Sequence, residues 1–167
     1  MKISLMENIL PHDLFEKAYF HFWDLVNSRE MEFDTVDFKR LFKHRDWFFD
    51  WLHKTVILNH AKKMFGMNIK PSYSFLSFYN RPDSVCPLHS DRPQCKYTID
   101  MSIIQDFDWP IYINFKPYFM KKNQAVCYSG TDHLHWRDRK PSKKYSDEFV
   151  GLAFFHFVDQ DFKGRLN

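Results

Sequence analysis

Hydrophobic positions in the first 65 residues recur at the spacing of a helix. Residues 13–26 carry a single apolar stripe, formed by Leu14, Phe15, Ala18, Phe22, Leu25 and Val26. Residues 45–65 carry a wider apolar face, and Gly66 follows at a position that commonly ends a helix. Between them we expect a polar connection at 27–35 and a short helix at 36–43. The pattern therefore predicts that residues 1–70 are mostly helical.

After Pro71 the pattern changes to short aromatic and β-branched runs that partly alternate between apolar and polar positions. The expected strands span residues 73–79, 85–89, 96–104, 111–115, 124–128, 131–135 and 149–158. Helices grouped before strands predict an α+β fold. So many short antiparallel strands favour a two-sheet jelly roll, with the N-terminal helices packed on the outside of one sheet.

Length and composition refine this expectation. A chain of 167 residues favours a single domain. We expect helical support from residues 1–70, a jelly-roll core at 71–159 and a C-terminal tail at 160–167. The 19 phenylalanines predict a core of large rings, and the 4 glycines form no phosphate-binding pattern. A net charge of +3 is too small to indicate nucleic-acid binding.

The cysteines and the N-terminal residues indicate the cellular compartment in which we expect the protein. The first ten residues include Glu7 and Asn8 where a signal peptide would need an apolar run. No apolar stretch approaches the length that crosses a membrane. The three cysteines are an odd number and suggest reduced thiols rather than a disulfide framework. We therefore expect a cytoplasmic protein without a membrane partner.

The candidate chemistry lies at His89 and Asp91, which are two residues apart. On a strand this spacing places both side chains on one face. With one more imidazole from a distant strand they could hold an octahedral metal and leave positions open, as in oxygen-activating ferrous sites. His133 and His135 share strand parity, so spacing does not choose between them.

Two simpler interpretations compete with an iron site. The side chains could form an ordinary hydrogen-bonded polar cluster. A zinc site is the other alternative, although the paired C-x-x-C spacing of zinc knuckles is missing; its donors would be Cys86, His89, Cys95, Cys127 and His135.

The ordered motifs resemble a known family. His89-Ser90-Asp91 is followed by Gly130, by His135-Trp136-Arg137-Asp138 and by Phe154-Phe155-His156-Phe157-Val158-Asp159. This set is similar to the 2-oxoglutarate/Fe(II)-dependent dioxygenase superfamily, and to its small prolyl-hydroxylase-like members in particular. The likeness covers about half of the chain. It implies a double-stranded β-helix with iron held by His89, Asp91 and His135, because the family's distal ligand directly precedes the Trp-Arg pair.

The resemblance also implies 2-oxoglutarate and O2 as cosubstrates. Tyr79, ten residues before His89, matches a tyrosine that contacts 2-oxoglutarate in prolyl hydroxylases. The family's cation for the far carboxylate is missing, because the last strand begins Phe149-Val150-Gly151. A buried carboxylate needs a donor. Arg137, which shares strand parity with His135, is the first candidate, and His156 is the second.

The function implied by the resemblance is hydroxylation of a protein side chain or small molecule, with decarboxylation of 2-oxoglutarate to succinate. The alternative is a non-enzymatic, cupin-like binding module or a structural metal protein. The basic run at 137–144 holds five cations and one anion, and could steer anionic molecules toward the site. The expected partners are thus 2-oxoglutarate and one further substrate.

Overall fold

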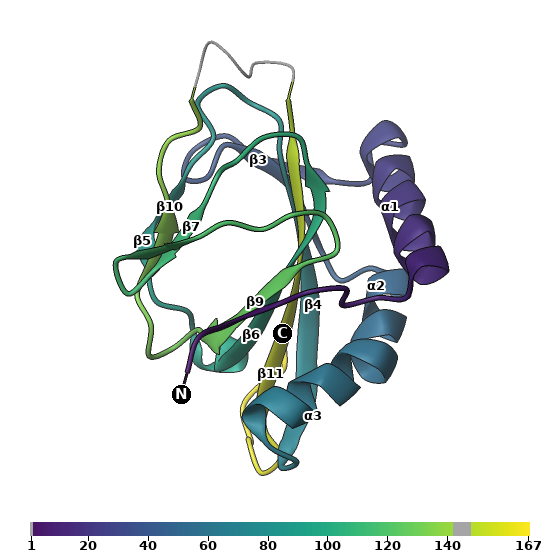
Figure 1. Ribbon diagram of the computed structural model, residues 1–167, viewed down its shortest axis with the longest axis vertical. Helices are drawn as coiled ribbons and strands as arrows, with labels where there is room; N and C mark the ends of the chain where they lie inside the picture. Colours follow the sequence, from purple (N-terminus) through teal and green to yellow (C-terminus); the bar gives the residue numbers. More distant parts are fainter. Residues whose placement is uncertain (1, 142–147) are drawn as a thin grey trace.

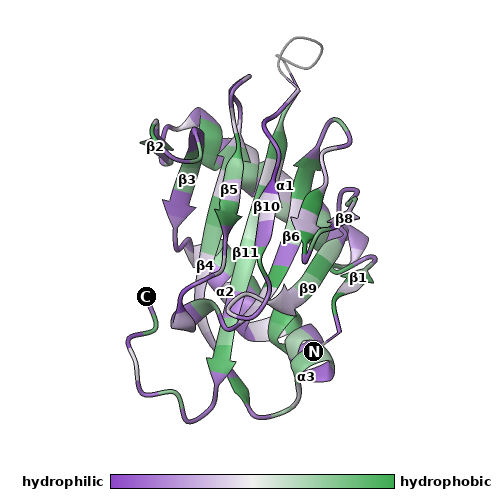
Figure 2. Ribbon diagram, turned by 90° about the vertical axis from the view of Figure 1, so that its left-hand side faces the viewer, coloured by the Kyte–Doolittle hydropathy of each residue, from purple (hydrophilic) through white to green (hydrophobic). Residues whose placement is uncertain are grey.

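Two antiparallel sheets face each other in the computed structural model, which describes residues 2–141 and 148–167 (Figure 1). In spatial order, the seven-stranded sheet contains β1 (Ser4–Met6), β9 (Ala125–Ser129), β6 (Tyr97–Gln105), β11 (Val150–Asp159), β4 (Ile69–Tyr79), β3 (Arg40–His44) and β2 (Glu32–Asp34). The four-stranded sheet contains β5 (Cys86–His89), β10 (His135–Arg137), β7 (Ile111–Ile113) and β8 (Lys116–Tyr118). Figure 2 shows β5 and β10 side by side in front of the larger sheet.

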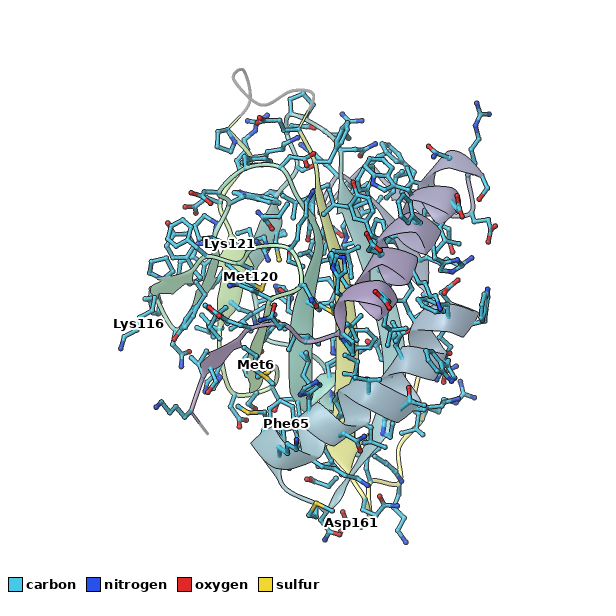
Figure 3. The ribbon with its side chains drawn as sticks, turned by 45° about the vertical axis from the view of Figure 1, so that its right-hand side comes forward. Met6, Phe65, Lys116, Met120, Lys121 and Asp161 are labelled. Atoms are coloured by element: carbon cyan, nitrogen blue, oxygen red, sulfur yellow. The ribbon has the colours of Figure 1, made fainter. Side chains whose placement is uncertain are left out.

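The helices lie against the larger sheet, on the side away from the smaller one (Figure 1). They are α1 (His12–Asn27), α2 (Trp47–Leu52), the π-helical turn η1 (His53–Ile57) and α3 (Leu58–Phe65). The apolar stripe of α1 buries Ala18, Phe22 and Leu25, as its spacing predicts. α3 ends at Phe65 (labelled in Figure 3), whose ring stacks on Tyr97 of β6 at 5.1 Å. One core therefore joins the helices to the larger sheet.

A second core fills the space between the two sheets. Its buried members come from both sheets and the connections between them: Tyr79, Phe107, Trp109, Ile111, Ile113, Met120, Val126, Tyr128, Val150 and Leu152. None of the helices in the described residues has both the length and the apolarity that crossing a bilayer requires. The three cysteines are buried and unpaired within the described residues.

The predicted helix at 36–43 is wrong. The carboxylate of Asp34 accepts hydrogen bonds from the backbone N–H groups of Val36 and Asp37, both at 3.1 Å, which makes a turn. The chain then continues into β3, which pairs with β4. The stacked rings of Phe42 and Phe75 (5.6 Å, 10°) stabilise this pairing across the strands. The connection predicted at 27–35 likewise contains β2.

Other boundaries also differ from the prediction. Residues 131–133 form a turn rather than a strand, and β10 begins only at His135. The long helix predicted at 45–65 is divided by η1. Within the basic run at 137–144, Arg137 and Lys140 are buried rather than exposed to solvent. Residues 142–144 of that run lie outside the described residues.

Candidate metal centre and cavity

Three side chains from the motif converge on one point between β5 and β10. The two strands are antiparallel neighbours, and their register places His89 opposite His135. Asp91 follows β5 by two residues. The Nε2 atom of His89 lies 3.5 Å from Asp91 Oδ1, and the Nε2 atom of His135 lies 3.6 Å from the same oxygen. The fold therefore brings together residues that are more than 40 positions apart in sequence.

Backbone carbonyls orient both imidazole rings. His89 Nδ1 lies 2.7 Å from the carbonyl oxygen of Pro87, and His135 Nδ1 lies 2.9 Å from that of His133. A ring nitrogen that faces a carbonyl oxygen must carry the proton and donate it. In the neutral ring the lone pair is then on Nε2, which faces Asp91, and this is the tautomer that a metal requires. Two imidazole nitrogens and one carboxylate oxygen are a donor set that suits iron.

The backbone around Gly130 fixes Asp91. The N–H of Asp91 donates to the carbonyl of Gly130 (2.8 Å), and the N–H of Gly130 donates to that of Lys96 (3.0 Å). A Cβ atom on Gly130 would lie 2.3 Å from Asp91 Oδ2 and 2.4 Å from the carbonyl oxygen of Cys95. Only glycine fits here without a shift, which gives the glycine of the motif a physical reason.

Asp91 is held in its ionised form. Burial raises the pKa of its carboxyl group, but the imidazoles of His135 and His89, which donate to it when Nε2 is also protonated, outweigh burial and hold the pKa well below its usual range. A carboxylate that carries a negative charge at the meeting point of two imidazoles is suited to offset the charge of a divalent cation.

The structure separates His133 from His135. The Nδ1 atom of His133 accepts a hydrogen bond from the backbone N–H of Ser129 (3.3 Å), whereas His135 reaches Asp91. Sulfur does not complete a zinc site among the described residues. The cluster nearest to one contains Asp91, Cys95 and His156, with a single thiol. Cys127 instead contacts Met6 in the core.

The three residues line a cavity of about 410 Å³, which is in the usual range for small-molecule sites. Much of its wall is aromatic, from Phe38, Tyr73, Phe75, Tyr79, Tyr128 and Phe154. Three arginines also reach it, namely Arg40, Arg92 and Arg137. A wall of rings with a few cations is suited to an anionic ligand with an apolar part.

Arg137, the first candidate for the cosubstrate carboxylate, lies in this wall but is already engaged. Its Nη1 donates to the carbonyl of Trp109 (2.6 Å), and its Nη2 pairs with Asp100 Oδ2 (3.3 Å). Burial raises the pKa of Asp100 to about 6 although Arg137 opposes the shift. The other carboxylate oxygen of Asp100 is buried and has no hydrogen-bond partner among the described residues.

The other two candidates also line the cavity. The hydroxyl of Tyr79 accepts a hydrogen bond from Arg40 Nη1 (3.1 Å). His156 pairs through Nδ1 with the hydroxyl of Thr98 (3.0 Å). Burial lowers the pKa of His156 to about 4, so its ring is neutral at pH 7. It can offer a hydrogen bond to a carboxylate but no charge.

Sequence reasoning missed Arg40, Arg92 and Asp100. Arg40 was missed because residues 36–43 were predicted to be a helix, whereas its place in the cavity depends on β3 pairing with β4 in the larger sheet. Arg92 directly follows Asp91 and could have been noticed as a neighbour of the motif. Asp100 lies nine residues after Asp91, on the buried strand β6. An aspartate in a strand that is otherwise apolar could have indicated a functional residue, because carboxylates are rarely buried without a partner.

The sequence matches no protein-family model and no curated protein. Its structure resembles SnoN, the non-heme α-ketoglutarate-dependent epimerase of nogalamycin biosynthesis, with a TM-score of 0.77 at 8% identity over 94% of this chain and 76% of SnoN. SnoN has also been crystallised with Fe3+, α-ketoglutarate and nogalamycin RO. The carbocyclase SnoK of the same biosynthesis gives 0.76 at 8% identity over 99% of this chain and 82% of SnoK.

A Pseudomonas putida prolyl-4-hydroxylase gives a TM-score of 0.74 at 10% identity over 94% of this chain and 92% of that protein. Together these similarities show that the chain has the double-stranded β-helix fold of 2-oxoglutarate/Fe(II)-dependent oxygenases. The prediction of a two-sheet jelly roll is therefore confirmed.

Proposed function

We propose that this protein is an Fe(II)- and 2-oxoglutarate-dependent oxygenase that hydroxylates a small molecule or protein side chain. One observation carries the proposal. The Nε2 atoms of His89 and His135 lie within 3.6 Å of one oxygen of Asp91, in a cavity of an oxygenase-type barrel. The neighbour SnoN, described with Fe3+ and α-ketoglutarate, supports this choice of metal and cosubstrate.

His89, Asp91 and His135 would hold the iron through one face and leave its remaining positions to exchangeable ligands. Bound iron with 2-oxoglutarate supplies oxidative chemistry, in which O2 is consumed, 2-oxoglutarate is decarboxylated to succinate and a C–H bond of the substrate is oxidised. The carbonyls of Pro87 and His133 keep both rings in the ligating tautomer. The aromatic wall would limit the access of water to the reacting atoms.

Arg137 would pair with the far carboxylate of 2-oxoglutarate, assisted by Asp100. A second carboxylate brought beside Asp100 would raise the pKa of Asp100 further, because two like charges oppose ionisation. With its pKa already at about 6, Asp100 would take up a proton and release Arg137 from their ion pair. Tyr79 would add a hydroxyl to this pocket, and His156 is the alternative partner without a charge.

We also infer that residues 1–167 form one domain. In this arrangement the helices of residues 1–70 support the outer face of the larger sheet. Residues 71–159 form most of the jelly roll, to which residues 1–70 add β1, β2 and β3, and residues 160–167 form a tail. The hydrophobic core that the helices share with the larger sheet supports the inference of a single domain.

The test compares two histidines that are neighbours in sequence but differ in geometry. Without oxygen, we expect the wild type to bind one Fe(II) and then 2-oxoglutarate in calorimetric titrations, and to form succinate when oxygen is admitted. His135→Ala should lose at least about 100-fold in iron affinity, because a ligand is removed. His133→Ala should keep iron, because its backbone carbonyl still orients His135. Equal losses in both variants, or iron binding without any 2-oxoglutarate binding, would contradict the proposal.

A further inference from the structure

Arg40 is a cation of the cavity that has only neutral partners. Its Nη1 donates to the hydroxyls of Ser77 (2.7 Å) and Tyr79 (3.1 Å). Within the part of the chain that the structure describes, it forms no ion pair with a carboxylate. Its Nε is buried and has no hydrogen-bond partner among the same residues. A guanidinium that lines a cavity and has only hydroxyl partners keeps its full positive charge and can bind an anion.

The hydroxyl partner Tyr79 does not cancel this charge. Burial raises the pKa of Tyr79 to about 12, so its ring is a neutral phenol at pH 7. Arg137 differs, because Asp100 already offsets its charge. The two guanidiniums also differ in exposure: Arg137 is 2% exposed, whereas Arg40 is half-buried. Of these two arginines, Arg137 is therefore a charge-compensated cation in the interior of the cavity, and Arg40 is an uncompensated cation nearer to solvent.

Flat apolar surfaces flank Arg40. Its guanidinium lies 3.9 Å from the ring centroid of Phe38 and 5.1 Å from that of Phe75. Phe38 in turn lies 5.9 Å from the ring of the metal-site residue His89. The N–H of Val85 donates to the carbonyl of Phe38 (3.1 Å), which holds this segment beside the start of β5. An anion on Arg40 with an apolar group attached would thus extend toward the metal site between rings.

Arg92 adds positive potential to the same cavity. Its Nη2 donates to the hydroxyl of Tyr73 (2.9 Å), and burial raises the pKa of Tyr73, so this partner is also neutral. Arg92 forms no ion pair among the described residues. Two cations without carboxylate partners in one cavity favour anionic over neutral ligands.

We propose that the primary substrate is a small carboxylic acid with a flat apolar group, and that Arg40 binds its carboxylate while Phe38 and Phe75 contact its apolar part. This inference rests on the proposed function, in which iron and Arg137 already account for the two carboxylates of 2-oxoglutarate. Arg40 is then left for the substrate, with a cavity large enough to admit a second small molecule.

The experiment uses phenylacetate and its neutral analogue phenylacetamide as probes. Each is titrated calorimetrically into Fe(II)-loaded protein saturated with 2-oxoglutarate in the absence of oxygen. The wild type should bind phenylacetate about 10- to 100-fold more tightly than phenylacetamide, as expected for a hydrogen-bonded charge pair. Arg40→Met should abolish this preference, and Arg40→Lys should retain part of it. Arg165→Met removes one exposed arginine outside the cavity and should leave the preference intact.

Affinity for 2-oxoglutarate is measured first on every variant, together with the melting temperature. Unchanged 2-oxoglutarate affinity in Arg40→Met, with the phenylacetate preference lost, supports the inference. Equal binding of both probes by the wild type overturns it, as does a loss of 2-oxoglutarate affinity in Arg40→Met, which would assign Arg40 to the cosubstrate. If neither the wild type nor any variant binds 2-oxoglutarate, the proposed function itself fails, and this inference fails with it.

Discussion

Gly130 is the residue at which local backbone geometry and the candidate metal site meet most directly. We expect Gly130→Ala to weaken Fe(II) binding by about 10- to 100-fold, a typical cost of disturbing the support of a metal ligand. The reason is steric, because the added Cβ would lie 2.3 Å from Asp91 Oδ2 and 2.4 Å from a backbone oxygen. Calorimetric titration of Fe(II) without oxygen measures the effect.

The matched control for this change is Gly151→Ala. Its Cβ would lie 3.0 Å from Phe22 and 3.1 Å from Ile104 in the helix–sheet core. It should therefore lower stability while leaving the iron affinity of the folded protein unchanged. Wild-type iron affinity in Gly130→Ala would show that Asp91 is not positioned by this contact.

Some candidate site residues could be predicted from the sequence and others could not, depending on whether their relation is local in the chain. His89 and Asp91 could be paired because their relation is local: they are two residues apart, at the end of β5 and just beyond it. His133 and His135 could not be separated by spacing, since what distinguishes them is which ring faces Asp91 across the sheet. Arg40 contacts Tyr79 from 39 residues away, and no local pattern encodes such a pairing. The roles of all these residues in binding remain predictions.

Among the elements, long periodic segments were predictable, and so were the short strands β5 and β7, but three other short strands were not. The 16 residues of α1 carry enough helical repeats to define its buried face. β1, β2 and β8 have three residues each, which is too few for any period to emerge. β1 is defined instead by its pairing with β9, in which Ser4 faces Cys127 across more than 120 positions of sequence. Such strands follow from tertiary structure rather than from local preference.

The π-helical turn η1 places a titratable side chain in the core. The ring of His53 lies 4.6 Å from that of Phe157, and its Nε2 has no hydrogen-bond partner among the described residues. Burial is the main cause that lowers the pKa of His53 to about 3. The unfolded chain, with a histidine pKa of about 6.5, then binds the proton more tightly than the folded protein. The stabilising contribution of neutral His53 is therefore present above pH 6.5 and is lost as the pH falls toward 3.

We accordingly expect His53→Gln to reduce the acid sensitivity of the protein. Between pH 7.5 and pH 5, the free energy of unfolding of the wild type should fall by about 2 kcal/mol more than that of the variant. The reason is that each pH unit below 6.5 costs the wild type about 1.4 kcal/mol for the proton that only the unfolded chain binds at His53. Urea unfolding at the two pH values measures this difference. His12→Gln, at an exposed side chain, should behave as the wild type. Equal losses in all three proteins would assign the acid sensitivity to other groups.

In the whole molecule, the candidate metal site and the helices lie on opposite sides of the larger sheet but share its strands. β11 and β6 contribute Phe155 and Ile99 to the helix–sheet core. The same two strands contribute His156 and Asp100 to the cavity wall. Burying apolar surface on both faces of these strands couples the two layers, so we expect the helices and the barrel to unfold together.

Metal binding offers a direct measurement of that coupling. Fe(II) at about 100 times its dissociation constant should raise the free energy of unfolding by about 2.7 kcal/mol through mass action, which corresponds to about 5–11 °C in melting temperature for a protein of this size. If the layers are coupled, the helical signal in far-ultraviolet circular dichroism and the aromatic signal in the near ultraviolet should shift together. His135→Ala should abolish both shifts, because it removes a proposed ligand. A helical transition that precedes the aromatic one and does not respond to Fe(II) would show that the helices form a separate cooperative unit, despite the core they share with the sheet.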